Sequence, residues 1–139
     1  MKLKNTHRYY IYKRDNKKCF FCDKKLKYRQ ITLDHYLPLS KGGINEVFNM
    51  VTSCKKCNKY KKDNIPRDYR KKILKLFIQA VKDDIITGKN IDMNNKTLKN
   101  ELLEVHRVER ITDNYISFQN YDKRFYIKKN KVIQISYLG

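Results

Sequence analysis

The chain has 139 residues, of which 33 are lysine or arginine and 14 are aspartate or glutamate, so its formal net charge is +19 at pH 7. This length suits one domain or a small module with an appendage. No run approaches the roughly 20 apolar residues of a membrane-spanning helix, and no membrane partner is expected. The basic N-terminus lacks an apolar stretch behind it, so we expect no secretory signal and an intracellular, cytoplasmic protein.

The positive excess is concentrated in the first half, where residues 1–65 hold 17 basic and 5 acidic side chains. Acids this few cannot neutralise the surface, which attracts polyanions and speeds encounter with them. DNA or RNA is therefore the expected partner. A merely solvated surface is the alternative, because 25 of the basic residues are lysine and AT-biased coding would produce them without selection for binding.

Short apolar runs predict two strands in the first half of the chain. Ile31–Leu33 reads as one strand, and Phe48–Thr52 can return beside it. Gly42 and Gly43 lie between them and permit a tight excursion of the backbone. A short helix is expected to open at Cys57.

A domain boundary is expected near residue 65, because Pro66 follows a polar run and precedes the clearest helical pattern. Residues 67–87 predict an amphipathic helix with Gly88 just past its end. Its apolar stripe comprises Leu74, Phe77, Ile78, Val81 and Ile85. Residues 89–100 read as loop or a weak helix start.

The remaining residues predict a small antiparallel sheet or meander, because β-branched and aromatic runs alternate with turn residues. These runs are Val105–Ile111, Tyr115–Gln119, Arg124–Ile127 and Val132–Tyr137. The fold class is therefore α+β, with a module at residues 1–65 and an accessory region at residues 66–139.

Four cysteines form two Cys-x-x-Cys pairs, Cys19 with Cys22 and Cys54 with Cys57. With two residues between them, both thiolates of a pair can bind the same ion, and two such pairs together complete one tetrahedral Zn²⁺ site. Two disulfides or four unrelated core cysteines are the alternatives, and a reducing compartment disfavours disulfides. Four thiolates leave no position for water, so zinc should be structural and should stabilise a module with a thin core.

The segment between the cysteine pairs is longer than the roughly 15–20 residues of an ordinary zinc site of this type. It contains an acid–imidazole pair and belongs to a series of elements in one order: Arg14-Asp15, the first cysteine pair, Asp34-His35, Pro38, Ser40-Lys41-Gly42-Gly43, Asn49, the second cysteine pair, Asn58 and Lys61. Over residues 9–62 this series resembles the HNH endonuclease family, and more closely its zinc-bearing branch with a ββα-metal core. Residues 66–139 lie outside the resemblance.

The resemblance implies a role for each matching residue. His35 and Asn49 form the catalytic group, with His35 as general base and Asn49 as an amide that holds the loop around it. Asp34 and Asn58 bind one catalytic Mg²⁺ or Mn²⁺. The implied reaction is hydrolysis of DNA, approached along the minor groove, with 5′-phosphate and 3′-hydroxyl product ends.

The same residue types suit phosphodiester hydrolysis on chemical grounds. An imidazole can take a proton from water near neutral pH, because the unperturbed pKa of histidine is about 6.5. Carboxylate and amide oxygens are ligands suited to Mg²⁺ or Mn²⁺. Six lysines surround the proposed site and could contact DNA phosphates: Lys41, Lys55, Lys56, Lys59, Lys61 and Lys62.

Each site residue also has a plainer reading. His35 could be an ordinary loop histidine, Asn58 could support a helix start, and Asp34 and Asn49 could be turn residues. The prediction is a metal-dependent DNA endonuclease, and the alternative is a non-catalytic, zinc-stabilised DNA-binding protein. A nuclease that reads a palindrome would usually be a homodimer, although the sequence contains no obvious dimer seam.

Overall fold

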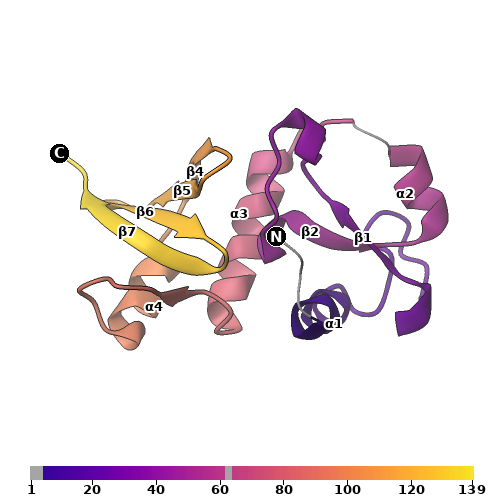
Figure 1. Cartoon of the computed structure of the whole chain (residues 1–139), viewed down its shortest axis with the longest axis horizontal. Coiled ribbons are helices and arrows are strands. Elements are labelled where there is room, and N and C mark those ends of the chain that lie inside the picture. The colour runs from indigo at the N-terminus through magenta and orange to yellow at the C-terminus, as the bar shows by residue number, and fades with distance from the viewer. Residues whose placement is uncertain (1–4, 62–63) are drawn as a thin grey trace. The chain divides into compact units, whose positions relative to one another are not determined.

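The computed structural model describes residues 5–61 and 64–139. They belong to two compact units, residues 1–67 and residues 68–139. The fold class is α+β, and the described residues form four α-helices and two sheets (Figure 1). None of these helices is long and apolar enough to cross a membrane.

The first unit contains two helices and a two-stranded antiparallel sheet. In chain order its elements are α1 (Asn5–Arg14), β1 (Thr32–His35), β2 (Met50–Ser53) and α2 (Lys55–Lys61).

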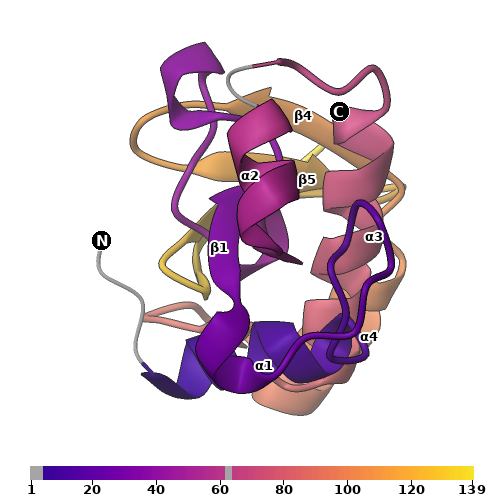
Figure 2. The ribbon, with the colours of Figure 1, turned by 90° about the vertical axis from the view of Figure 1, so that its right-hand side faces the viewer.

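The pairing of β1 with β2 determines where the acid–imidazole pair lies. Asp34 pairs with Val51 and His35 pairs with Met50, so both side chains belong to the end of a strand rather than to the loop after it. β2 is buried along its whole length, whereas β1 is half-buried. α1 packs against β2, and α2 packs against β1 (Figure 2).

The core of the first unit is small and includes the cysteines. One buried cluster joins α1 to the cysteine region through Tyr12, Cys19, Leu26, Ile31 and Cys54. The sequence did not predict α1, whose residues are mostly tyrosine and basic. Its buried side chains, Ile11 and Tyr12, are covered only when the helix packs against the rest of the unit.

The second unit is a five-stranded sheet with two helices. Its strand order is β3-β7-β6-β5-β4, in which every pairing is antiparallel except that of β3 with β7. The elements in chain order are α3 (Tyr69–Lys82), β3 (Thr87–Gly88), α4 (Asn95–Leu103), β4 (Arg107–Ile111), β5 (Ile116–Gln119), β6 (Lys123–Lys128) and β7 (Lys131–Tyr137).

The predicted helix at residues 67–87 is too long. α3 ends at Lys82, Asp84 adopts a left-handed φ of 59°, and Gly88 lies in β3 instead of following the helix. The predicted weak start at residues 89–100 is a full helix, α4, because the Asn94 side chain accepts a hydrogen bond from Thr97 N at 2.9 Å and caps it.

The buried face of α3 is also rotated relative to the predicted stripe. Phe77 and Val81 are buried as expected, but their buried companions are Ile73, Leu76 and Ala80. Leu74, Ile78 and Ile85 are only half-buried. Helical periodicity identified the right element, while packing against the sheet and α4 selected the face.

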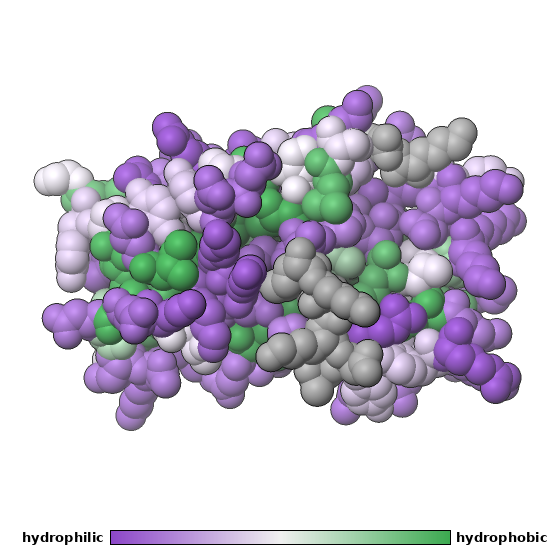
Figure 3. Space-filling view, viewed as in Figure 1, coloured by the Kyte–Doolittle hydropathy of each residue, from purple (hydrophilic) through white to green (hydrophobic). Residues whose placement is uncertain are grey.

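An aromatic pair marks the centre of the second core. Phe77 on α3 and Phe118 on β5 stack with ring centroids 3.8 Å apart, and both are fully buried. Phe125 and Ile127 of β6 lie in the same core at 0% exposure. The outer surface is very different, because hydrophilic side chains predominate on the face shown in Figure 3.

Candidate active site and metal centre

Four cysteine sulfur atoms lie together in the first unit. All four Sγ atoms are within 4.8 Å of one another, and those of Cys22 and Cys54 are 3.9 Å apart. Tetrahedral Zn–S bonds of about 2.3 Å place sulfurs about 3.8 Å apart, so the cluster has the dimensions of a zinc site. The four cysteines predicted to bind one metal ion are therefore brought together, and zinc suits their thiolate donors. Its members are Cys19, Cys22, Cys54 and Cys57.

The thiols influence one another's ionisation. Burial raises the pKa of Cys19, but hydrogen bonds from the backbone of Cys54, Cys22 and Phe21 outweigh it and lower the pKa to about 7. Burial and then hydrogen bonds with the other cysteines raise the pKa of Cys57 to about 12. The thiol of Cys19 therefore ionises near neutral pH, whereas that of Cys57 needs a nearby cation to ionise. A divalent metal ion supplies that compensation for the whole cluster.

The cluster joins three segments of the first unit. The turn that carries the first pair is held to β2, where Phe20 N donates to Thr52 O at 2.8 Å. The second pair lies at the start of α2, where Cys57 N donates to Cys54 Sγ at 3.4 Å. A metal ion at this point would therefore fix α2 relative to the sheet.

A buried ion pair fixes α1 against β2. Arg14 Nε lies 3.0 Å from Asp15 Oδ1, and the two side chains are only 4% and 3% exposed. Arg14 Nη2 donates to Met50 O at 2.6 Å, and Asp15 Oδ2 accepts from Thr52 N at 2.8 Å. Because backbone groups satisfy both charges, the pair serves as an anchor for the strand opposite Asp34 and His35.

The His35 imidazole is held by a side chain from the following loop. Its Nε2 lies 2.5 Å from Asn45 Oδ1. With the amide oxygen facing the ring, Nε2 carries the proton and donates it, so the lone pair lies on Nδ1. His35 is half-buried, which gives the ring a fixed orientation without closing it off from solvent.

Asp34 carries a buried oxygen without a hydrogen bond. Its side chain is 16% exposed, and Oδ2 has no hydrogen-bond partner among the described residues. Burial raises the pKa of this carboxyl group, while the positive charge of Lys61 opposes the rise. Lys61 Nζ lies 3.6 Å from Oδ2, within ion-pair distance but too far for a good hydrogen bond. An oxygen in this condition is a suitable metal ligand.

Asn49 organises the loop between the two strands. It is fully buried, and its side-chain oxygen accepts from Leu37 N at 2.9 Å. Its Nδ2 donates to Leu37 O at 3.1 Å and to Ile44 O at 2.9 Å. The loop also needs glycine at position 43, because a Cβ there would lie 1.8 Å from Leu37 O. Because Asn49 holds the backbone of Ile44, the next residue, Asn45, follows a fixed position in the loop.

Asn58 approaches the site from α2. It is half-buried, and its side chain forms no hydrogen bond with another described residue. Lys61 follows it by three residues, so the two lie on the same face of the helix. Since Lys61 contacts Asp34 and donates to His35 O at 2.9 Å, this face of α2 is turned toward the end of β1.

The six predicted DNA-contacting lysines do not share one environment. Lys61 is an exception because its side chain is only 10% exposed and engages Asp34 and His35. Lys62 lies outside the described residues. The other four are exposed: Lys41, Lys55, Lys56 and Lys59.

Sequence reasoning missed two parts of this site. The sequence analysis gave no role to Asn45, which lies two residues after Gly43 and ten after His35. Lys61 was predicted to contact a DNA phosphate, with a solvated side chain as the alternative, and its contacts with Asp34 and His35 were not foreseen. Neither interaction has a signal in the sequence that would distinguish it from a solvated side chain.

Comparison with known proteins confirms the resemblance for part of the chain. Residues 19–74 match the family model described as HNH endonuclease. A search of curated proteins and a search of solved structures each found no match. The matched segment contains all four cysteines and the four predicted site residues, Asp34, His35, Asn49 and Asn58, whereas most of the second unit lies beyond it.

Proposed function

We propose that this HNH-type segment is a metal-dependent DNA endonuclease, with β1, β2 and α2 as its ββα-metal core. The observation that carries the proposal is the arrangement at the end of β1. Asn45 holds the imidazole of His35, the neighbouring Asp34 has a buried carboxylate oxygen without a hydrogen bond, and Lys61 brings α2, which bears Asn58, to the same end of the strand. The family match over residues 19–74 supports the same activity.

In the proposed mechanism, His35 acts as the general base. Nδ1 takes the proton from the attacking water, and the Asn45 contact at Nε2 keeps the ring in the tautomer that leaves Nδ1 free. Asn49 acts as a positioning residue, because its hydrogen bonds to Leu37 and Ile44 hold the loop that carries Asn45. Neither asparagine needs to touch the substrate.

Asp34 and Asn58 would hold the divalent ion. Oδ2 of Asp34 fits this role because it is buried without a hydrogen bond, and an asparagine side chain adds a second hard oxygen. Bound Mg²⁺ or Mn²⁺ would neutralise the phosphate and stabilise the leaving 3′-oxygen. Lys61 keeps the carboxylate charged and in place, since its ammonium also bonds the backbone at His35.

The exposed lysines of α2, together with the one in the loop between β1 and β2, would supply most of the affinity for DNA. Lys55, Lys56 and Lys59 project from α2, and Lys41 from the loop. Contacts of this kind neutralise phosphates and release counterions, so binding should weaken steeply with salt. The product ends expected from the family are a 5′-phosphate and a 3′-hydroxyl.

The experiment compares cleavage of supercoiled plasmid by the wild-type protein, His35→Ala and His106→Ala, with Mg²⁺ or Mn²⁺ added in turn. Loss of the base should slow cleavage about 10²- to 10⁴-fold. His106 serves as the matched control because it lies in the second unit, where its ring contacts Tyr121. Zinc content and DNA affinity should stay unchanged in both variants. Cleavage by His35→Ala at the normal rate would remove His35 from the mechanism.

A zinc-stabilised DNA-binding protein without activity is the second candidate. One observation favours it, namely that the Lys61 ammonium lies 3.6 Å from Asp34 Oδ2 and so competes with a cation for that oxygen. The same plasmid experiment separates the two functions. Salt-dependent binding without nicking in every metal tested would support the second candidate and exclude the first.

A further inference from the structure

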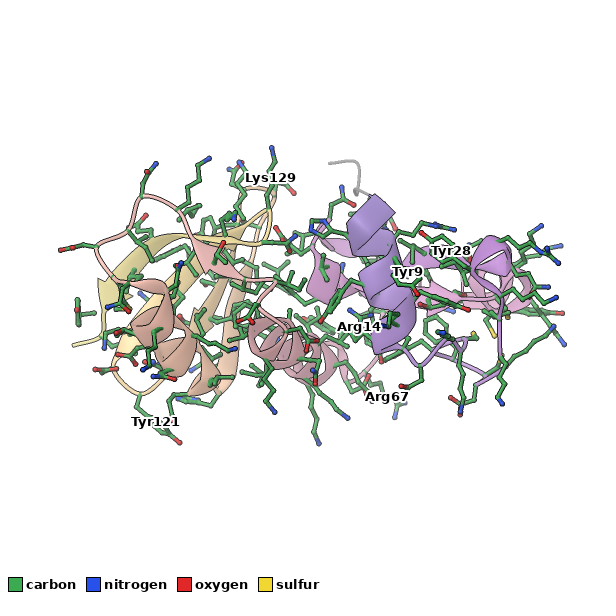
Figure 4. The ribbon with its side chains drawn as sticks, turned by 90° about the horizontal axis from the view of Figure 1, so that it is seen from below. Tyr9, Arg14, Tyr28, Arg67, Tyr121 and Lys129 are labelled. Atoms are coloured by element: carbon green, nitrogen blue, oxygen red, sulfur yellow. The ribbon has the colours of Figure 1, made fainter. Side chains whose placement is uncertain are left out.

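Two tyrosine rings are exposed beside each other on the first unit. Tyr9 on α1 is 45% exposed, and Tyr28, in the turn before β1, is 37% exposed. Their ring centroids are 5.5 Å apart with planes at 72° (Figure 4). We call these two residues the tyrosine patch.

The tyrosine patch is surrounded by positive charge. The Arg8 guanidinium lies 5.6 Å from the Tyr28 ring centroid, and Lys13 Nζ lies 5.9 Å from that of Tyr9. Neither α1 nor the segment 27–30 contains an acidic residue. Aromatic rings with cations and no acids nearby complement a nucleic-acid strand, whose bases stack on the rings while its phosphates meet the cations.

The core beneath the patch is closed by a third ring. Tyr12 is only 6% exposed, and its hydroxyl donates to Leu26 O at 2.5 Å. Tyr9 and Tyr28 pack against it with centroids 6.2 Å and 5.4 Å away. Their inner surfaces therefore cover Tyr12, while their outer surfaces remain in water. A purely structural cover would need only apolar side chains here, without large exposed rings.

Arg8, which lies beside the tyrosine patch, is bound to the start of the strand that carries the proposed catalytic residues. Arg8 Nη2 donates to Ile31 O at 2.9 Å, immediately before β1, and His35 ends the same strand. Four residues of extended strand span about 13 Å. Because stacked nucleotides rise about 3.4 Å each, that distance corresponds to about four nucleotides. A DNA strand cut at His35 would therefore need about four nucleotides to run the length of β1 toward the patch.

We propose that the tyrosine patch binds unpaired bases of the DNA that the nuclease cleaves, so that its substrate is DNA with a single-stranded segment, such as a gap or a branch. Bases in an intact duplex stack on each other and offer the rings no free face. The inference rests on the proposed function for the position of the cut, but binding to the patch can be measured without cleavage.

The test measures affinity in the full-length, zinc-loaded chain carrying His35→Ala, which separates binding from hydrolysis. Fluorescence anisotropy would follow binding of three labelled DNAs: an intact duplex, the same duplex with a short gap, and a single strand. The double substitution Tyr9→Leu and Tyr28→Leu keeps an apolar cover over Tyr12 but removes both rings. Tyr121→Leu is the matched control, since that ring is 81% exposed in the second unit.

The double variant should lose about ten-fold in affinity for the gapped duplex and the single strand, with duplex binding changed less than two-fold. Tyr9→Phe with Tyr28→Phe should bind like the parent, because the rings persist. An equal loss for all three DNAs, or no loss at all, would overturn the proposal. If the leucine variant does not fold, photocross-linking of iodouracil-labelled single strands to the parent decides: links at Tyr9 or Tyr28 support the patch, and links only elsewhere refute it.

Discussion

The two units of this chain are stabilised in different ways. The first unit has a two-stranded sheet, and two of the five residues in its central buried cluster are cysteines. The second has a five-stranded sheet and a core that contains the stacked rings of Phe77 and Phe118. The comparison teaches that a metal ion bound by the four cysteines would let the first unit keep a small core and leave its strand ends and loops free for the proposed chemistry.

The largest expected effect comes from removing zinc. Structural zinc sites contribute about 10–16 kcal/mol in small modules, more than the total stability of a typical domain. Chelation, or Cys54→Ser, should therefore unfold the first unit and leave the second folded. Amide hydrogen exchange tests this directly, because β1 and β2 should lose protection while β5 and β6 keep it. Loss of protection in both units together would contradict the comparison.

The reverse experiment weakens the apolar core of the second unit. Phe118→Ala should reduce the free energy of unfolding of that unit by about 3–5 kcal/mol, because it removes a fully buried ring and leaves a cavity. Zinc content, measured with a colorimetric chelator, should not change. Tyr121→Ala is the control and should alter stability little, since its side chain is 81% exposed. Zinc loss in the Phe118 variant would show that the two cores depend on each other.

A third experiment separates chemistry from structure inside the first unit. Asn45→Ala should lower kcat about 10- to 100-fold with KM and zinc content unchanged, because only the orientation of His35 is disturbed. Asn49→Ala should instead destabilise the unit, since it leaves backbone groups of Leu37 and Ile44 unsatisfied. Asn45→Asp retains an oxygen for Nε2 and should recover part of kcat. A drop in thermal stability with Asn45→Ala equal to that with Asn49→Ala would remove the distinction.

The smallest effect concerns the pH dependence of the second unit. Hydrogen bonds from Arg124 hold the pKa of Glu109 below its ordinary value of 4.5. The stabilisation is therefore complete above that ordinary value and is lost as the pH falls through the lowered, folded-state pKa. Glu109→Gln should make amide protection in β4 and β6 less sensitive to pH in this acidic range. Identical pH profiles for the variant and the wild type would show that the pair contributes nothing.

The residues of the candidate site were mostly visible in the sequence, but their connections were not. The four cysteines and the Asp34-His35 pair have characteristic spacing, which local patterns preserve. The contacts of Asn45 with His35 and of Lys61 with Asp34 could not be read from spacing, because Asn45 reaches its partner across a loop and Lys61 from a helix. His35 and Asn45 are 10 positions apart in the sequence, and Asp34 and Lys61 are 27 apart. Whether such residues meet depends on how the backbone turns between them.

The secondary structure was likewise predicted from the sequence only in part. Alternating and helical patterns predicted β5, β6 and β7 and most of α3, because these elements contain their own apolar period. They did not predict α1, whose residues bury little by themselves, or the parallel pairing of β3 with β7, which joins Thr87 to Lys131 across the chain.

By itself, the sequence determined the basic surface, the four-cysteine cluster, the α+β class and the resemblance to a nuclease family, since each follows from residue types and their spacing. Only the tertiary structure decided which nitrogen of His35 is held by Asn45, which lysine leaves the solvent to meet Asp34, and which tyrosines remain outside the core. The physical reason is that a charge or hydrogen bond acts over a few ångströms in space, whatever the distance along the chain.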